Sequence, residues 1–270
     1  MKKLSECELL DGLTRIASLA AAAILSIGRE DLHTREKPDR SPVTAADEAS
    51  EAVILDGLAR LLPEIPVISE EAVGRQRAAP SGASLLLVDP LDGTQEFIAG
   101  LDEYTINIAL IEDGVPHAGV IAAPKRGLVW RGVVGFCAER LALAPGAAVE
   151  AANERIAVRT RKQAAAGARV LLSRSHLEAE TLAYVGRLDR PERVICGSSL
   201  KYCLIAEGSA DLYPRFARLS EWDVAAGHAL LLAAGGGVVA ADGGPIHYGH
   251  RDLRLPPFIA FGDRAALPGI

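Results

Sequence analysis

The sequence predicts an α+β arrangement in its first half and an α/β arrangement in its second, and three observations support this prediction. Two helical patterns come first, and a series of apolar strands with short turns follows them. After an Ala-, Pro- and Gly-rich stretch at 144–152, strand and helix patterns alternate along the chain. With 270 residues, of which 49% are apolar, the chain can bury a large core. We therefore expect two close-packed layered lobes, residues 1–145 and residues 146–270.

The first element is an amphipathic helix expected over residues 4–28. Apolar residues recur along it every three or four positions, at Leu9, Leu13, Ile16, Ala20, Ile24 and Ile27. Its uncharged stretch, residues 16–27, is shorter than the roughly 20 apolar residues that span a bilayer. We expect this helix to cover a core, and peripheral contact with the cytoplasmic face of an inner membrane stays open as an alternative.

A second helix is expected over about residues 44–62, and a set of short strands follows it. Asp113-Gly114 separates two long apolar runs, and such a pair favours a tight hairpin turn. The strands predict an antiparallel-rich sheet that the two helices cover. They are expected at residues 66–69, 85–88, 104–112, 116–123 and 128–137.

The second half alternates between apolar strands and helices, which predicts a lobe with helices layered on a sheet. Strands are expected at residues 170–172, 193–196, 211–214 and 238–240. Helices are expected at residues 177–188, 199–207 and 221–234. Binding sites are common between lobes, so motifs from both halves could meet in one cleft.

Charge and cysteine content argue against a nucleic-acid-binding protein and favour one with free thiols. The net charge is −6, whereas binding a nucleic-acid polymer needs an excess of Lys and Arg. A small anionic substrate is compatible with this charge if bound cations supply local positive charge. The four cysteines form no Cys-x-x-Cys pair, so we expect free thiols and a cytoplasmic protein. Glu6, Glu8 and Asp11 argue against a signal peptide.

The strongest chemical signal is the sequence Asp-Pro-Leu-Asp-Gly-Thr at 89–94, directly after an apolar strand. Asp89 and Asp92 flank a turn that Pro90 stiffens, so both carboxylates can face one point. Carboxylates bind hard divalent cations such as Mg²⁺, and amide groups at a helix start bind phosphate. The motif therefore predicts a metal-dependent phosphatase, although Asp92 could also simply cap a helix after a turn.

Three further acidic residues stand at the ends of expected elements, and each also has a purely structural interpretation. Glu70 follows an apolar strand, where it either reaches the same sheet edge as Asp89 or forms a solvated turn. Asp223 lies in the first turn of a helix, where it would complement the helix dipole. Asp47 follows Thr44 by three residues, a spacing that fits a capping box. On spacing alone, the cap is the better interpretation of Asp47.

Residues 42–47, 69–71 and 89–94, with the later Trp222-Asp223 pair, resemble the inositol monophosphatase superfamily over nearly the whole chain. This superfamily comprises lithium-sensitive, Mg²⁺-dependent phosphatases with a layered α-β-α-β-α sandwich, the fold of fructose-1,6-bisphosphatase. The resemblance implies two or three Mg²⁺ ions and a metal-activated water that attacks the phosphate in line. The implied metal ligands are Glu70, Asp89, the carbonyl group of Leu91, Asp92 and Asp223.

The resemblance also implies roles around the phosphate. Gly93 and Thr94 would receive it on backbone N–H groups and on the threonine hydroxyl. Asp47 would pair with Thr94 to activate the attacking water, and Glu70 would take part in catalysis. Asp223 would contact the substrate as well as a metal ion. No covalent intermediate is implied, because the motif spacing differs from the Asp-x-Asp-x-Thr of haloacid dehalogenase-type phosphatases.

Three segments of the second half, residues 173–176, 197–201 and 213–216, resemble those of 3′(2′),5′-bisphosphate nucleotidases. The resemblance implies hydrolysis of adenosine 3′,5′-bisphosphate to AMP and phosphate, a step that serves sulfate assimilation. An ordinary surface or capping role stays open for each residue implied in nucleotide binding. These residues are His176, Ser198, Lys201 and Arg215.

Two alternatives stay open. The same fold could act on inositol phosphate or fructose 1,6-bisphosphate, because Gln95 and the segment 218–221 depart from the nucleotidase pattern. The chain could also be an inactive scaffold or a metal-binding regulator, although such a role would not need the complete acidic set. The expected partner is a small phosphorylated molecule, and we expect a monomer or a homodimer.

Overall fold

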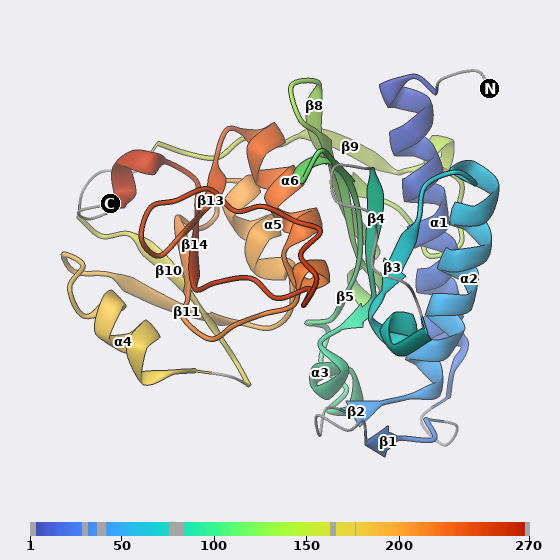
Figure 1. Ribbon diagram of the computed structural model, residues 1–270, viewed down its shortest axis with the longest axis horizontal. Coiled ribbons are helices and arrows are strands. Elements are labelled where there is room, and N and C mark those ends of the chain that lie inside the picture. The colour runs from blue at the N-terminus through green and yellow to red at the C-terminus, as the bar shows by residue number, and fades with distance from the viewer. Residues whose placement is uncertain are drawn as a thin grey trace.

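The protein consists of five layers of secondary structure, as described from a computed structural model (Figure 1). The structure describes residues 4–28, 32–36, 42–75, 84–162, 166–175 and 177–267. Helices α1 (Glu6–Ser26) and α2 (Ala45–Leu61) form the first layer, and a seven-stranded sheet forms the second. Helices α5 (Leu200–Ala206) and α6 (Ala225–Ala234) separate it from a five-stranded sheet, which α4 (Ala179–Val185) covers. The expected α-β-α-β-α sandwich is confirmed.

The seven-stranded sheet has the order β3-β4-β5-β6-β7-β8-β9 and is antiparallel except for the parallel pair β3 and β4. Its strands are β3 (Val67–Ser69), β4 (Leu85–Asp92), β5 (Thr105–Glu112), β6 (Val115–Ala123), β7 (Leu128–Val133), β8 (Cys137–Ala142) and β9 (Glu154–Ala157). Asp113 and Gly114 have φ angles of 51° and 78°, so the expected tight hairpin between β5 and β6 is confirmed. The single strand expected at 128–137 is wrong, because a turn at Gly135 splits it into β7 and β8.

The division expected between residues 145 and 146 stays a prediction. Strand β9 follows this point in the sequence, yet it still pairs with β8 in the first sheet. A two-stranded ribbon, β1 (Arg35–Glu36) with β2 (Pro42–Val43), lies near the short helix α3 (Thr94–Ile98) at one end of that sheet.

Alternate residues of β4 face different helical layers, as the pleat of a strand requires. Leu86 and Val88 pack in one core cluster with residues of α1 and α2. Leu85 and Leu87 pack in a second cluster with residues of α5 and α6. Strand β4 is therefore buried on both faces, and its last residues reach the layer between the two sheets.

Helix α1 combines an apolar composition with a buried face. Within the described residues it is the one helix long and apolar enough to cross a membrane, and 56% of its apolar window is buried in the molecule. Leu13 and Ile24 are fully buried against the first sheet's core. The expectation that this helix covers a core is confirmed.

The five-stranded sheet has the order β11-β10-β12-β14-β13 and mixes parallel with antiparallel pairs. Its strands are β10 (Arg169–Ser173), β11 (Glu192–Cys196), β12 (Leu212–Arg215), β13 (Gly237–Ala240) and β14 (Phe258–Phe261). Strand β14, which lies between β12 and β13, was not expected from the sequence. The helix expected over 221–234 divides into a 3-10 turn, Glu221–Asp223, and α6.

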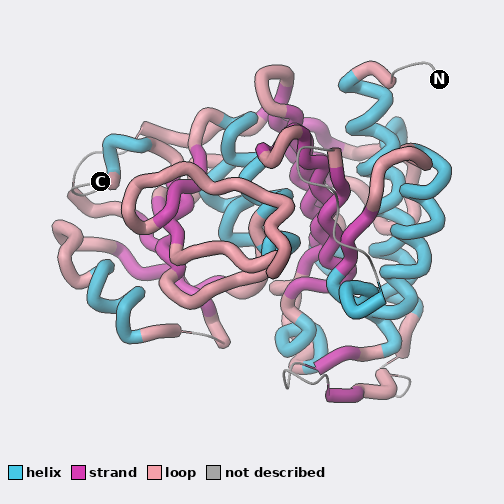
Figure 2. Tube along the Cα trace, viewed as in Figure 1, coloured by secondary structure: helices cyan, strands magenta, loops and turns pink. Residues whose placement is uncertain are grey.

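The loop between β13 and β14 joins the two halves of the molecule. It extends back toward the first sheet (Figure 2), where the Tyr248 N–H donates to the carbonyl oxygen of Gly114 at 2.9 Å. Glu221, at the start of the 3-10 turn, accepts from the N–H groups of Gly249 and His250 in the same loop. These bonds fix the turn that leads into Asp223.

Candidate active site

A β-bulge in β4 turns Asp89 and Asp92 toward the same face of the first sheet. Asp89 lies opposite Asn107 on β5. Asp92, three residues further on, lies opposite Thr105, only two residues away along β5. Residues three apart in a regular strand face opposite sides, and the extra residue of a bulge reverses this. Pro90 suits the bulge, because it has no N–H to donate to the sheet.

Two further acids reach the same place from other elements. Strand β3 runs parallel to β4, and Glu70 is the first residue after it. Asp223 ends the 3-10 turn before α6, and its Oδ2 accepts from the Ser220 N–H at 2.9 Å. One carboxylate oxygen from each of Glu70, Asp89 and Asp223 lies within 4.8 Å of the other two. The structure thus brings three of the four predicted acidic ligands into one group, which we call the acidic group, and Asp92 lies beside it.

Burial and mutual repulsion disfavour the charged form of these carboxylates. Burial raises the pKa of Asp89 well above its usual range, and the charges of the neighbouring acids raise it further. Burial also raises the pKa of Asp223, and the charges of Asp92 and Glu70 raise it further. Asn107 Oδ1, opposite Asp89, is buried and has no hydrogen-bond partner among the described residues. An oxygen-rich, negatively charged site of this kind fits a hard divalent cation.

Removing divalent cations is expected to destabilise the protein more at about pH 8 than at about pH 5. The unfolded chain releases its Asp protons near a pKa of about 3.9, whereas buried Asp89 and Asp223 keep theirs to higher pH. Above the unfolded pKa, the metal-free folded protein therefore loses stability as pH rises. A bound cation removes this penalty, and at about 100 times its Kd it would stabilise the fold by about 2.7 kcal/mol.

Thermal unfolding with Mg²⁺ and with a chelator, each at the two pH values, measures this effect. The quantity to compare is the difference in Tm between the two conditions at one pH, because other groups also titrate. An equal difference at both pH values would contradict the expected repulsion within the acidic group.

Asp47 makes both contacts that were predicted for it, the capping box with Thr44 and the pairing with Thr94. Its Oδ2 accepts from the Thr44 N–H at 2.8 Å and from the Thr44 hydroxyl at 2.7 Å, which completes the capping box of α2. Its Oδ1 accepts from the Thr94 hydroxyl at 3.1 Å. Thr94 Oγ1 also lies 3.2 Å from the carbonyl oxygen of Leu91, the predicted backbone ligand. Thr94 therefore links Asp47 to the strand that carries the acidic residues.

A cavity of about 440 Å³ lies beside the acidic group and is lined by both halves of the chain. The predicted residues that line it are Asp92, Gly93, Thr94, Ser198, Lys201, Arg215 and Asp223. Gly93 has a φ angle of 94°, a left-handed conformation that glycine adopts easily and that lets β4 turn directly into α3. His176, also predicted to bind nucleotide, lies outside the described residues.

The two predicted cations of the second half are buried in the cavity wall. Lys201 Nζ donates to the carbonyl oxygens of Ser198 at 2.7 Å and Cys196 at 3.2 Å, and it lies over the Tyr213 ring. Arg215 forms an ion pair with Glu178 at 2.8 Å. Both cations therefore help to build the wall, in addition to any contact they make with a ligand.

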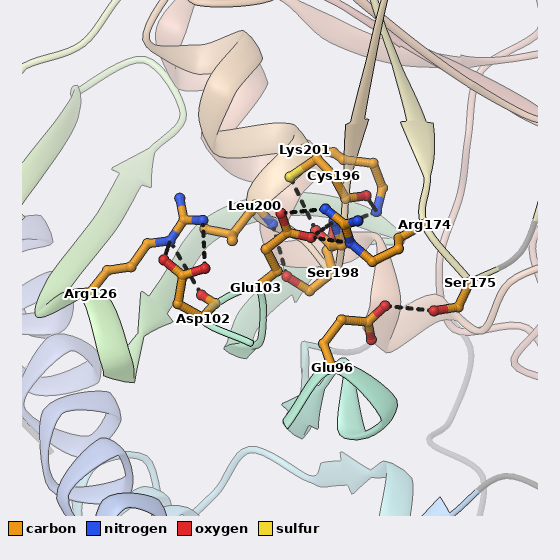
Figure 3. Close-up of polar contacts among 11 residues, drawn as sticks. Glu96, Asp102, Glu103, Arg126, Arg174, Ser175, Cys196, Ser198, Leu200 and Lys201 are labelled. Carbon is orange, nitrogen blue, oxygen red and sulfur yellow. Dashed lines mark hydrogen bonds and ion pairs between the residues drawn. The ribbon is translucent and has the colours of Figure 1, made fainter. Parts of the chain in front are cut away.

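Polar contacts that were not predicted from the sequence join the two halves at the cavity (Figure 3). Glu103, in the loop before β5, accepts two hydrogen bonds from the Arg174 guanidinium, each of 2.8 Å. The same carboxylate accepts from the Gly197 N–H at 2.8 Å. The bond from Arg174 is the main cause of a lowered pKa of Glu103. On α3, Glu96 accepts from the Ser175 hydroxyl at 2.7 Å.

Two residues beside Asp92 were also missed. Ser199 and Asn107 both contact the Asp92 carboxylate, at 2.7 Å and 3.5 Å. Ser199 lies within the segment 197–201 that resembles the nucleotidases, but the residue predicted there to bind nucleotide is its neighbour Ser198. No local signal marks Asn107, which is one polar residue within an apolar strand.

Comparison with known proteins agrees with this geometry. The sequence model of the "Inositol monophosphatase family" matches residues 7–264. The chain is 41% identical over 253 residues to the "3'(2'),5'-bisphosphate nucleotidase CysQ" of Escherichia coli O6:H1, covering 92% of this chain and 97% of that protein. The crystal structure of CysQ from Bacteroides thetaiotaomicron aligns with a TM-score of 0.77 and 36% identity, over 97% of this chain and 100% of that one. The inositol monophosphatase from Anabaena (Nostoc) aligns with a TM-score of 0.74 and 25% identity, over 96% and 92%.

Proposed function

The chain belongs to the inositol monophosphatase family, and we propose that it hydrolyses the 3′-phosphate of adenosine 3′,5′-bisphosphate to give AMP and phosphate. One observation carries the proposal: a single cavity borders the acidic group and also contains cationic side chains. Arg174, Lys201 and Arg215 line it from the second half of the chain. A bisphosphate offers one phosphate to the acidic end and another to these cations, which hydrogen-bond phosphate strongly.

Mg²⁺ suits the donor set, because it prefers oxygen ligands and a compact site. We assign it to the carboxylates of the acidic group, the Asp92 carboxylate and the Leu91 carbonyl oxygen, with two or three ions in the working enzyme. When bound, the ions supply positive charge that offsets phosphate repulsion and lowers the pKa of water. In the same proposal Glu70 and Asp223 serve catalysis and substrate contact as well as metal binding.

Thr94 and Asp47 are proposed to take the proton of the attacking water. Thr94 Oγ1 accepts that proton while its own passes to Asp47 Oδ1, the oxygen that it already faces at 3.1 Å. Thr44 donates twice to the other carboxylate oxygen, which keeps Asp47 in place for this transfer. The N–H groups of Gly93 and Thr94 stand at the start of α3, where amides have no partner within the helix, and hold the phosphate.

The wall cations are proposed to select a second phosphate. Lys201 has three N–H donors and two carbonyl partners, so a donor is available for an anion in the cavity. Arg215 and Ser198 line the same cavity and complete the proposed nucleotide contacts within the described residues. A simple monoester has no second anion for these groups, so it would not use them.

Adenosine 3′,5′-bisphosphate is therefore expected to be hydrolysed with a higher kcat/KM than inositol 1-phosphate, which has no second phosphate for the wall cations. Fructose 1,6-bisphosphate carries two phosphates, so it tests whether the adenosine part of the substrate contributes as well. Each charge-assisted hydrogen bond that a substrate cannot make costs roughly 1.5–3 kcal/mol, which is about 10- to 100-fold in kcat/KM. Phosphate release by the purified chain with Mg²⁺ measures the three substrates side by side. A higher value for either alternative would reject the substrate and keep the phosphatase, whereas no release from any of them would reject the activity itself.

Inositol phosphate stays the second candidate, because the Anabaena inositol monophosphatase shares the fold along nearly the whole chain. We also propose a cytoplasmic location, which the buried face of α1 supports. Inhibition by lithium, a role in sulfate assimilation, and a monomeric or homodimeric state stay predictions.

A further inference from the structure

Ser199 immediately precedes α5, at a position where serine ordinarily caps a helix. Its side chain makes no capping hydrogen bond. Its hydroxyl instead donates to Asp92 Oδ2 at 2.7 Å, and the residue is only 1% exposed. A serine of the second half thus contacts an acid of the first sheet in preference to its own helix.

Asn107 fixes the direction of this contact. Asn107 Nδ2 donates to Ser199 Oγ at 2.9 Å, and a hydroxyl has one proton of its own to give. Ser199 Oγ lies 2.7 Å from Asp92 Oδ2 and 3.2 Å from the carbonyl oxygen of Asp223. The shorter contact is the one to the Asp92 carboxylate, so Asp92 receives the proton. The three side chains form one hydrogen-bond network, in which Asn107 reaches Asp92 through Ser199 and also contacts it directly at 3.5 Å.

The loop that carries Ser199 is itself held by the first half of the chain. The Gly197 N–H donates to Glu103 Oε2. Arg174 binds the same carboxylate (Figure 3). A Cβ atom at Gly197 would lie 2.9 Å from the backbone oxygen of Glu103, so this close approach requires glycine. Lys201 Nζ donates to the carbonyl oxygen of Ser198, in the middle of the loop. Hydrogen bonds to Glu103 and from Lys201 therefore hold the loop next to Asp92.

We propose that Ser199, held by Asn107, is a positioning residue that fixes the Asp92 carboxylate across the two halves of the molecule and thereby sets the affinity of the site for divalent cations. The inference rests on the proposed function, because Asp92 is assigned there as a metal ligand. Ser199 donates to Oδ2, so Oδ1 would be the oxygen that binds a cation. A carboxylate already held in one orientation loses less freedom when a metal ion binds.

Ser199→Ala is expected to weaken Mg²⁺ binding by about 10- to 100-fold, the usual effect of removing a group that orients a metal ligand. Titration calorimetry on the purified full chain without substrate gives the Kd of Mg²⁺ directly. Ser18→Ala is the matched control, because Ser18 is equally buried and its hydroxyl donates to the Ala147 carbonyl at 2.9 Å, in the α1 layer. The control should bind Mg²⁺ as the wild type does.

A rescue variant and a double-mutant cycle separate positioning from a loss of packing. Ser199→Thr keeps the hydroxyl and should restore most of the Mg²⁺ affinity. Asn107→Leu should weaken binding by itself, and the combined effect of the two substitutions should be smaller than the sum of their separate effects, because both residues belong to one hydrogen-bond network. Tm values of the metal-free variants report any change in folding separately.

Wild-type Mg²⁺ affinity in Ser199→Ala would overturn the inference and leave the proposed function intact. Fully additive effects of Asn107→Leu and Ser199→Ala would also overturn it, because each residue would then act independently. If the wild-type chain bound no Mg²⁺, the metal assignment would fail, and the inference would fail with it.

Discussion

Asp89→Asn is expected to lower the kcat of phosphate release by about 10³-fold while leaving the fold intact. Asp89 is the most central acid of the site, with Glu70, Asp92 and Asp223 all close enough to raise its pKa. Asparagine removes one negative charge from the proposed metal ligands and should so weaken the electrostatic stabilisation of the reacting phosphate. It retains a carbonyl oxygen that can accept from the Leu91 N–H, as Asp89 Oδ1 does at 3.0 Å.

Although it lowers kcat, the same variant should stabilise the metal-free protein. Asp89 carries a charge that burial and its neighbours disfavour, so neutral asparagine should raise the Tm in a chelator at about pH 8. The gain in Tm on adding Mg²⁺ should become smaller. Asp113→Asn makes the same change at an exposed hairpin turn and should alter neither quantity.

Near-normal turnover in Asp89→Asn would show that this carboxylate is not a metal ligand. A lower Tm in the chelator would show that the acid stabilises the fold through contacts other than those described. Only a large loss of kcat together with a higher metal-free Tm agrees with a group of buried carboxylates whose mutual repulsion a bound cation offsets.

The acidic residues could be predicted because each stands next to a local signal. Asp89 and Asp92 flank a proline, and the structure explains why that matters, since Pro90 occupies a bulge that brings both carboxylates to one face. Glu70 ends a strand, and Asp223 ends a short turn before a helix. The convergence of these segments depends on how the second half packs on the first. Resemblance to a known family predicted this convergence, because spacing along the chain does not reveal it.

The residues that join the two halves could not be predicted in this way. Asn107 and Ser199 are 92 positions apart, and Glu103 and Gly197 are 94 apart. Each looks ordinary in its own segment, as a polar residue in a strand, a serine before a helix or an acid in a loop. The unexpected strand β14 has the same cause, because its place between β12 and β13 comes from long-range pairing.

Thr94→Val is expected to lower kcat by about 10²- to 10⁴-fold with little change in Mg²⁺ affinity. Valine has almost the shape of threonine but cannot pass a proton to Asp47, whose Oδ1 lies 3.1 Å from the Thr94 hydroxyl. The lost hydrogen bond should cost only about 1 kcal/mol of stability. Thr94→Ser keeps the hydroxyl and should retain most of the activity.

Separate measurements of kcat and of the Mg²⁺ Kd decide between proton transfer and metal binding as the function of this hydroxyl. Thr14→Val is the matched control, because the Thr14 hydroxyl is buried and donates to a backbone carbonyl of α1, on the side of the first sheet away from the cavity. It should lower stability without lowering kcat. If Thr94→Val weakened Mg²⁺ binding as much as it lowered kcat, Thr94 would serve the metal site through the Leu91 carbonyl, and Asp47 would be a helix cap alone.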